Sequence, residues 1–304
     1  MITSKANYTN NMANDWRFEN LWNESLIPVE RKPEPRERIF ASELGMPMVD
    51  RYLKMKGVSY TNPPNKRALR KMQAGRFFEW IVAFVLKRAD MLITREERVY
   101  SQIEGGLQVS GKLDFLGGGT PNFEKAKKEI EIYDLPDFIK TQSLSIIETF
   151  EKSGERTFEQ MILELKSVSS FVMNGVLATK AALPHHELQG YHYSLNKNLP
   201  CNVVYICRDD MMIEEIPIVD MKRLGEKYRT DILCITGYYN NNERPPLEQL
   251  IKWEFGQFKV NRGVEYSNYL QMLYGFETPE QYRAKVNGTV TGINRVVKRI
   301  INGD

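Results

Sequence analysis

Two charged residues within an apolar stretch are the strongest chemical signal in this sequence. Glu164 and Lys166 stand in the run 161–168, whose other residues are mostly apolar. Residues two apart in a strand share a face, so this carboxylate and ammonium would point the same way, with Leu163 and Leu165 facing the opposite layer. Ions are costly to bury without partners. A metal ion beside a phosphate is one such partner, and a plain ion pair is the alternative.

Asp114 is a second candidate, in the run 109–116, where apolar residues stand on both sides of it. Asp is a poor strand former, so its place inside a predicted strand needs a reason. A functional carboxylate is one reason. An Asp at the strand end, hydrogen-bonded to the adjacent glycines, is the other.

Glu79 lies on a predicted helix, three residues before Val82 and four before Ala83, and interrupts the apolar face of that helix. A single Glu has a surface or capping role by default. The preceding residues 75–78, Gly-Arg-Phe-Phe, instead indicate a closely packed helix with its acid turned inward.

Gln189 and Tyr193 are four residues apart and therefore share a helical face. Gln can bridge a phosphate or a water molecule, and Tyr can stack on a base or donate to a phosphate; a half-buried Tyr is the structural alternative. The three histidines, His185, His186 and His192, lack the spacing of zinc ligands.

Composition and missing motifs exclude several function classes. The chain has 304 residues, enough for one large core or one domain with extensions. No apolar run approaches the roughly 20 residues of a membrane span. Residues 1–14 lack a secretory apolar segment, and three irregularly spaced cysteines fit a reducing cytoplasm. There is no phosphate-binding Gly-Lys-Ser/Thr loop and no Gly-x-Ser-x-Gly elbow, which disfavours ATP-driven and serine-nucleophile chemistry.

Positive charge is concentrated in one segment. The net charge is only +3, but residues 51–88 carry ten Lys and Arg residues against one acid, Glu79. Such clustering indicates a polyanion partner, and a solvated helix face explains it equally well. The ten are Arg51, Lys54, Lys56, Lys66, Arg67, Arg70, Lys71, Arg76, Lys87 and Arg88.

Helical and alternating patterns predict an α/β fold, with a central mixed β-sheet flanked by helices and with helical N- and C-terminal additions. Helices are expected over 43–56, capped by Ser42 and closed by Gly57, and over 66–90, 171–182, 185–197 and 219–239. Strands are expected over 94–104, 107–116, 159–168, 201–208 and 211–218, the first two forming a hairpin around Glu104-Gly105-Gly106. The predicted organisation is an arm (1–38), a core (39–240) with a surface insertion (117–157), and a C-terminal extension (241–304).

Four motifs in this order resemble the PD-(D/E)XK nuclease superfamily. They are Gly75-Arg76-Phe77-Phe78-Glu79 on a helix, Gly111-Lys112-Leu113-Asp114 and Glu164-Leu165-Lys166 on strands, and Gln189-Gly190-Tyr191-His192-Tyr193 on a helix. The pattern is most similar to the RecB-like branch, which includes CRISPR adaptation nucleases and relatives of lambda exonuclease. The segment 41–47 also resembles the opening helix of that branch, so the resemblance covers about 40–218. It implies a restriction-endonuclease-like core and a metal-dependent DNA nuclease, with an exonuclease favoured over an endonuclease.

The resemblance also implies a role for each candidate. Asp114 and Glu164, with the backbone carbonyl of Leu165, would hold Mg²⁺ or Mn²⁺, and Glu79 would hold a second ion or a metal-bound water. Lys166 would orient or deprotonate the attacking water and stabilise negative charge. Gln189 and Tyr193 would position the scissile strand. Lys66, Arg67, Arg70, Lys71 and Arg76 would bind the DNA backbone.

Two features depart from the resembled family. Some members hold an iron–sulfur cluster through one early and three late cysteines, but Met46 stands near the early position and residues 253–258 contain no cysteine. We therefore expect no cluster. The gap between Asp114 and Glu164 is long, so the insertion is expected to shape access to DNA, and another acid in it could replace Asp114 as the ligand.

Two further readings compete with a nuclease. A non-catalytic DNA-binding or recombination module of the same fold would bind DNA without cleaving it. An α/β adaptor protein with a purely structural charged strand would bind neither polyanions nor metal. The expected partners of the nuclease are DNA ends, with a recombination protein or further copies of the chain as additions, and no membrane.

Overall fold

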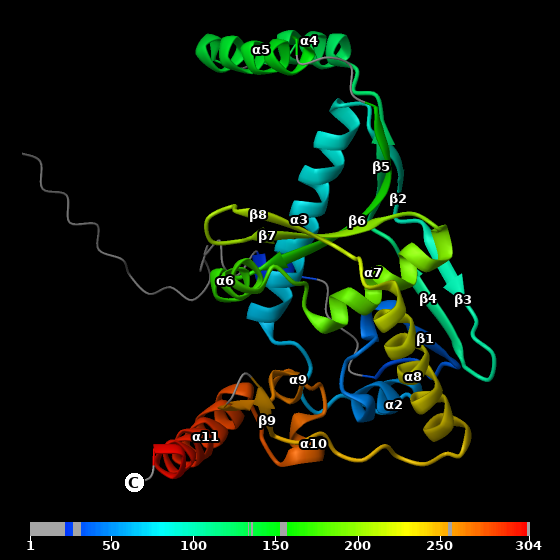
Figure 1. Ribbon diagram of the computed structural model, residues 1–304, viewed down its shortest axis with the longest axis vertical. Coiled ribbons are helices and arrows are strands. Elements are labelled where there is room, and N and C mark those ends of the chain that lie inside the picture. Colours follow the sequence, from blue (N-terminus) through cyan, green and yellow to red (C-terminus); the bar gives the residue numbers. More distant parts are fainter. Residues whose placement is uncertain are drawn as a thin grey trace, which may run out of the picture.

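The computed structural model describes residues 22–26, 32–132, 134, 136–152, 157–254 and 257–302. Most of the predicted arm at 1–38 lies outside these residues. The core is a five-stranded sheet in the order β2 (Leu92–Arg95), β5 (Phe115–Gly119), β6 (Phe158–Val168), β7 (Cys201–Cys207) and β8 (Ile213–Pro217) (Figure 1). Only β6 and β7 run parallel, so the sheet is mixed. The predicted α/β fold with helices around a mixed sheet is confirmed.

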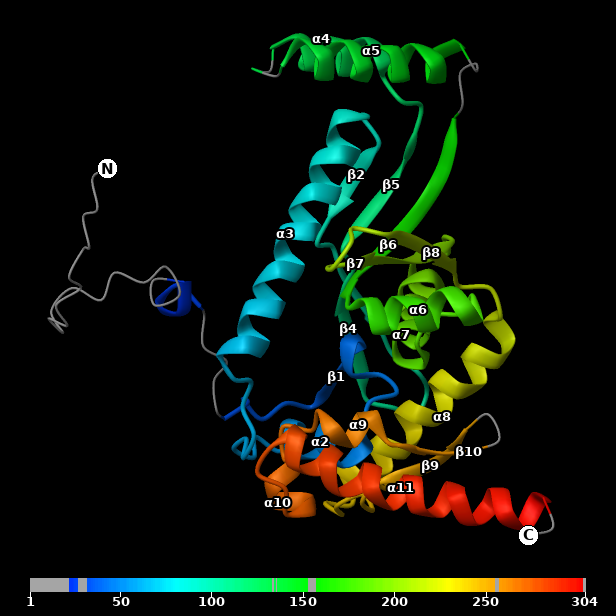
Figure 2. The same cartoon turned by 90° about the vertical axis from the view of Figure 1, so that its left-hand side faces the viewer.

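Helices cover both faces of this sheet. Figure 2 shows α3 (Lys66–Arg88) on one side, with α6 (Ser170–Thr179) and α7 (Pro184–Lys197) on the other. Helix α8 (Met221–Asn240) packs against α7. Strand β6 alternates between the two layers, because Ile162 and Val168 join the main core, whereas Leu163 and Leu165 pack with the sheet-facing residues of α3. These helices and strands form close to the predicted bounds.

The two strands predicted over 94–104 and 107–116 are each divided between two sheets. Their outer halves, β3 (Arg98–Ser101) and β4 (Gln108–Lys112), form a smaller sheet with β1 (Arg38–Phe40). The predicted hairpin turn is present, with Gly105 at φ +72°. The division leaves Asp114 in the bend between β4 and β5 and not inside a strand, which corrects its expected placement.

The helix predicted over 43–56 is broken. A short 3₁₀ turn (Ala41–Glu43) precedes α2 (Met48–Met55), and Gly45 between them adopts φ +70°. Pro47 precedes the first turn of α2, a position that needs no backbone N–H. Gly57 closes the segment at φ +69°, as predicted. Ser42 lies inside the 3₁₀ turn and does not cap a helix.

Helix α3 uses only part of its apolar surface to pack on the sheet. Its packed residues are Phe78, Val82, Ala83 and Leu86. Its exposed large apolar residues are Met72, Phe77, Trp80, Ile81, Phe84 and Val85, with Trp80 exposed to 70%. The apolar repeat at Phe77, Ile81, Phe84 and Val85 therefore marks an outward face. Glu79 shares the packed side with its neighbours Val82 and Ala83, as predicted.

The insertion and the C-terminal extension lie at opposite ends of the molecule (Figures 1 and 2). The insertion forms two helices, α4 (Phe123–Ile132) and α5 (Asp137–Lys152), beyond the end of α3, while its first glycines, 117–119, belong to β5. The extension contains β9 (Ile251–Glu254), β10 (Gln257–Val260), α9 (Arg262–Glu265), α10 (Leu270–Tyr274) and α11 (Pro279–Asn302), with a small core of its own. The predicted domain boundaries stay a prediction. No helix in the described part of the chain has the length and apolar character of a membrane span.

Arg51 belongs to the interior, which corrects its assignment to one basic binding surface. Its side chain is 1% exposed and donates to both carboxylate oxygens of Asp231 on α8, each at 2.7 Å. The Asp231 carboxylate also accepts from the Gly45 N–H at 3.4 Å. This pair therefore joins the N-terminal turn and α2 to α8.

Asp231→Asn should lower the free energy of unfolding by about 3 kcal/mol, because it leaves the Arg51 guanidinium buried without a counter-charge. Urea unfolding followed by circular dichroism measures this change. Lys180→Met is the control, since it removes an ion pair with Glu214 in which the lysine is 65% exposed and should change stability by no more than about 0.5 kcal/mol. Equal stability of Asp231→Asn and wild type would contradict a structural role for Arg51.

Candidate active site

The candidate site lies at the bend between β4 and β5, where the chain passes from the smaller sheet into the five-stranded sheet. Phe115 and Leu163 are the last paired residues of β5 and β6 on this side, because the chain before Phe115 turns away toward β4. The carboxylate of Asp114 replaces the missing backbone partner, and its Oδ2 accepts from the Leu165 N–H at 2.8 Å. Residues 51 positions apart in the sequence are thereby brought together.

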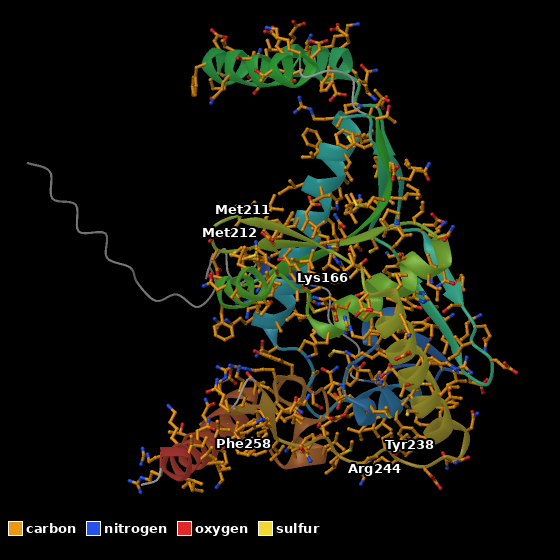
Figure 3. The ribbon with its side chains drawn as sticks, in the orientation of Figure 1. Lys166, Met211, Met212, Tyr238, Arg244 and Phe258 are labelled. Atoms are coloured by element: carbon orange, nitrogen blue, oxygen red, sulfur yellow. The ribbon has the colours of Figure 1, made fainter. Side chains whose placement is uncertain are left out.

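Glu164 and Lys166 point the same way, as the alternating pattern predicts. The Lys166 ammonium lies 2.6 Å from Glu164 Oε1, in the middle of the molecule (Figure 3). Glu164 is 1% exposed, and its other oxygen, Oε2, is buried without a hydrogen-bond partner among the residues that the structure describes. Lys166 therefore pairs with only one of the two oxygens of Glu164, and the charge of Asp114 in the adjacent bend adds a second carboxylate to the same place.

Burial is the main cause that raises the pKa values of both acids, and a neighbouring carboxylate adds to it in each case: Glu164 for Asp114, and Glu79 for Glu164. Burial, and then the charge of Glu164, raise the pKa of Asp114 from 3.8 to about 7, against the effect of Lys166. Burial also raises the pKa of Glu164, although Lys166 acts to lower it. Two carboxylates with raised pKa values at one place indicate a site that binds positive charge, whether protons or a metal ion.

Lys166 stays protonated between these acids. Burial acts to lower its pKa, but the charges of Glu164 and Asp114 together raise the pKa above its usual value. The Lys166 side chain is 19% exposed and that of Glu164 is 1% exposed, so the ammonium is the more accessible charged group of this pair.

Glu79 reaches the same cluster from α3. Its side chain is half-buried, and burial followed by the charge of Asp114 raises its pKa. Among the residues that the structure describes, no three His, Cys, Asp or Glu side chains come close enough to form a metal site on their own. Glu79 therefore interacts with Asp114 by charge but does not complete a three-carboxylate set.

The donor set present fits a hard divalent cation. Asp114 and Glu164 supply carboxylate oxygens, and the unpartnered Oε2 of Glu164 is the atom that a cation would satisfy. The N–H and C=O of one strand residue point to the same side. The Leu165 carbonyl therefore faces Asp114, as its N–H does. Three oxygen donors of this kind suit Mg²⁺ or Mn²⁺, with water filling the remaining positions.

Gln189 and Tyr193 lie behind the acids on α7. Gln189 Nε2 donates to the Tyr193 hydroxyl at 3.2 Å, and that hydroxyl donates to the Lys112 carbonyl at 3.1 Å. Burial and the charge of Glu164 raise the pKa of Tyr193, so its hydroxyl remains a donor. These bonds hold the end of β4, two residues before Asp114. The predicted contact of Gln189 and Tyr193 with a scissile strand stays a prediction.

Gly111 makes room for this arrangement. A Cβ at this position would lie 2.6 Å from Tyr193 Cε1, 2.8 Å from the Tyr193 hydroxyl and 2.8 Å from Ala41 Cβ. The glycine of the Gly-x-x-Asp motif is therefore explained by the close approach of α7 to β4, and not by an unusual backbone angle.

The predicted DNA-binding residues lie along α3. Lys66, Arg67, Lys71 and Arg76 are exposed. Arg70 is half-buried, and its Nε donates to Asn23 at 3.1 Å. Their contact with a nucleic acid stays a prediction, as does the whole assignment of roles.

Two cations at the site were not among the candidates. Lys112 pairs with Glu96 at 3.0 Å, and Arg95 ends the edge strand β2. Lys112 stands inside the Gly-x-x-Asp motif, and Arg95 opens the charged run Arg95-Glu96-Glu97-Arg98. This charged run is the sequence feature that could have indicated Arg95. Its position at the site follows from the pairing of β2 with β5.

No protein-family model matches the chain, and no curated protein matches it. Two solved proteins are similar to it at a distance. The crystal structure of SSO0001 has a TM-score of 0.37 and 14% identity, and the match covers 71% of this chain and 84% of that chain. The alkaline exonuclease LHK-Exo from Laribacter hongkongensis has a TM-score of 0.40 and 14% identity, covering 73% and 93%. Its complex with dAMP has a TM-score of 0.40 and 12% identity, covering 67% and 88%. Similarity at these TM-scores carries no argument about function, which must be inferred from the residues of this chain.

Asp114→Asn should make the metal-free protein more stable at pH 8, by a few kcal/mol. Because the carboxyl pKa is raised from 3.8 to about 7, the folded protein holds a proton that the unfolded chain has lost. Stability therefore falls as the pH rises through this window, and Asn, which can still accept from the Leu165 N–H, removes the loss. Urea unfolding in EDTA from pH 4 to pH 8 measures it.

Glu104→Gln on the exposed hairpin turn is the control for this substitution and should keep the pH dependence of the wild type. If Asp114→Asn showed the same fall in stability with pH as the wild type, the burial of an ionisable Asp114 would be wrong.

Gly111→Ala should lower the free energy of unfolding by about 1–3 kcal/mol, because the added methyl group must displace Tyr193 or Ala41. Gly175→Ala is the matched control: a Cβ there meets nothing within 4 Å, and the helix should gain about 0.5–1 kcal/mol. Chemical denaturation of the two variants tests the pair. Equal effects in both would show that Tyr193 does not press on β4.

Proposed function

We propose that this protein is a metal-dependent nuclease of the PD-(D/E)XK type that hydrolyses phosphodiester bonds in DNA. The observation that carries the proposal is the bond between the Asp114 carboxylate and the Leu165 amide, which places Asp114 beside the pair of Glu164 and Lys166. An acid pair with an adjacent lysine on a strand is the chemical equipment that metal-assisted phosphodiester hydrolysis requires.

The cation would be held by the Asp114 and Glu164 carboxylates and by the Leu165 carbonyl. When bound, a divalent ion polarises the phosphate and lowers the pKa of water. The residues of the chain then have separate tasks. Asp114 is fixed by the Leu165 N–H, so its free oxygen points into the site without a further ordering cost. Glu164 uses Oε1 for Lys166 and leaves Oε2 for the ion.

Lys166 supplies positive charge to the site. Its ammonium donates to Glu164 and keeps further N–H groups for a water molecule or a phosphate oxygen. A cation at this place orients the attacking water and stabilises the negative charge that develops on phosphorus-bound oxygens. Glu79, half-buried with a raised pKa, can accept a proton from a water molecule at the α3 side of the site.

The exposed basic residues of α3 would hold the DNA backbone. Lys66, Arg67, Lys71 and Arg76 lie on the helix that also carries Glu79, so a strand following this helix passes the acids. Contacts with phosphate release counterions, and binding should therefore weaken as salt rises. Exonuclease action is favoured over endonuclease action by the family that the motifs resemble.

A non-catalytic DNA-binding module of the same fold is the second candidate. The observation that favours it is that the described residues contain no cluster of three metal-binding side chains. It predicts salt-sensitive binding of DNA with no cleavage in Mg²⁺ or Mn²⁺. The two candidates therefore separate in one cleavage assay.

Glu164→Gln and Lys166→Met should each reduce Mg²⁺- or Mn²⁺-dependent degradation of linear DNA by roughly 10²–10³-fold, because each removes a charge that acts on the reacting phosphate. Gel analysis of labelled single- and double-stranded DNA in Mg²⁺, Mn²⁺ and EDTA measures the loss, with circular dichroism to confirm folding. Lys180→Met, which removes an exposed ion pair with Glu214 and touches neither acid, should keep full activity. Wild-type rates in either site variant would refute the assignment, and a wild-type protein that binds DNA without cleaving it would support the second candidate.

A further inference from the structure

Arg95 stands beside the candidate site on the edge strand of the sheet. It ends β2, and its register partner on β5 is Phe115, the residue that follows Asp114. The next residue, Glu96, donates its N–H to the Asp114 carbonyl at 3.1 Å. Backbone hydrogen bonds between the two strands therefore hold Arg95 next to Phe115, the residue that follows Asp114.

The guanidinium group is held on the side of the sheet that α3 covers. Register partners in an antiparallel pair share a face, and the Arg95 guanidinium lies 5.9 Å from the centre of the Phe115 ring. Phe115 packs in the cluster that contains Phe78 and Val82 of α3. Arg95 is therefore on the same side as Glu79, and contact with an aromatic ring restricts its motion.

No acid in the described part of the chain neutralises this guanidinium by direct contact. The nearest acid in sequence, Glu96, is paired with Lys112 at 3.0 Å, and Arg95 makes no side-chain hydrogen bond or ion pair with the part of the chain that the structure describes. Arg95 is also half-buried. Five N–H donors in a half-buried position, without an acceptor among the described residues, are suited to binding an anion.

Neighbouring charges increase the attraction for an anion. Arg76 of α3, Arg95 of β2 and Lys112 of β4 all act on Glu96, whose pKa is lowered chiefly by the hydrogen bond from Lys112. Arg95 and Lys112 also act on Glu79. Three cations from three separate elements thus surround the α3 side of the site, and Arg76 and Arg95 are without a carboxylate partner in the described structure.

We propose that Arg95 binds a phosphate of the nucleic acid next to the scissile phosphate at the Asp114–Glu164 site, and so sets the register of the strand there. This inference rests on the proposed function. The planar fork of Arg95 accepts two non-bridging oxygens of one phosphate, which a lysine cannot reproduce. Arg95 is then a substrate-positioning residue on the opposite side of the sheet from Lys166.

A structural alternative is that Arg95 only keeps Glu79 ionised. That role would act through the proton balance of Glu79, so its loss would lower kcat and shift the pH profile without changing affinity. Phosphate binding instead changes affinity and its salt dependence. The two roles therefore differ in what they alter.

The test compares wild type, Arg95→Ala and Arg95→Lys, with Arg229→Ala on the exposed surface of α8 as the matched control. Binding of a fluorescent oligonucleotide in EDTA is followed by anisotropy over a range of salt concentrations, and cleavage in Mg²⁺ gives KM and kcat. Arg95→Ala should weaken binding and raise KM by roughly 10-fold or more, and reduce the slope of log affinity against log salt by about 1. Arg95→Lys should recover the slope but only part of the affinity, and Arg229→Ala should match wild type.

Unchanged KM, affinity and salt slope in Arg95→Ala would overturn the inference, as would a loss confined to kcat with a shifted pH profile. Failure of the proposed function has a different signature. If the wild-type protein binds DNA but does not cleave it, the measured affinity and its salt dependence still decide the role of Arg95. A wild-type protein that neither binds nor cleaves nucleic acid would overturn both proposals.

Discussion

The hydrogen bond from the Leu165 N–H to the Asp114 carboxylate is the contact on which the site depends. Strand β6 loses its backbone partner on this side, where the chain leaves β5 for the second sheet. A buried N–H left without an acceptor would cost about 1–3 kcal/mol. The Asp114 side chain satisfies it, so the same carboxylate completes the sheet and supplies an oxygen to the site. Moving it would disturb both the fold and the chemistry.

The negative charge of the site is only partly compensated by the described residues. The half-buried Asp114 and the buried Glu164 lie near one lysine, and one oxygen of Glu164 has no partner among the described residues. A purely structural ion pair would be expected to satisfy all its atoms, because unpaired buried charge is strongly destabilising. The raised pKa values of Asp114 and Glu164 mean that the ionised forms of these two acids are disfavoured in the folded protein. A bound cation would remove this penalty, and this would distinguish a binding site from an ordinary ion pair.

The sequence predicted features that depend on local periodicity. The alternation in 161–168 placed Glu164 and Lys166 together, and the four-residue spacing placed Gln189 above Tyr193. It did not predict the division of the two long strands, because β4 leaves the main sheet to pair with β1, about 70 residues earlier in the chain. The burial of Arg51 likewise depends on Asp231, 180 residues later.

Helix α3 shows a different limit of sequence patterns. Large apolar residues surround much of this helix, so the repeat that includes Phe77, Ile81 and Phe84 fits an inward face as well as an outward one. The sheet selects the side of Phe78 and Val82 instead. The choice follows from where the sheet places Phe115 and Leu165, which local periodicity does not contain.

The two sides of the site differ in accessibility, and this difference sets the direction from which a substrate can approach. On the α7 side, Tyr193 and Gln189 are 1% and 6% exposed and close the site behind Glu164. On the α3 side, Glu79 and Arg95 are half-buried and Arg76 is exposed. A polyanion that binds here would approach from the α3 side, where Arg76 and Arg95 have no carboxylate partner among the described residues. Burial on the α7 side leaves Glu164 little freedom, and the positive charge on the α3 side would attract a phosphate toward the two carboxylates.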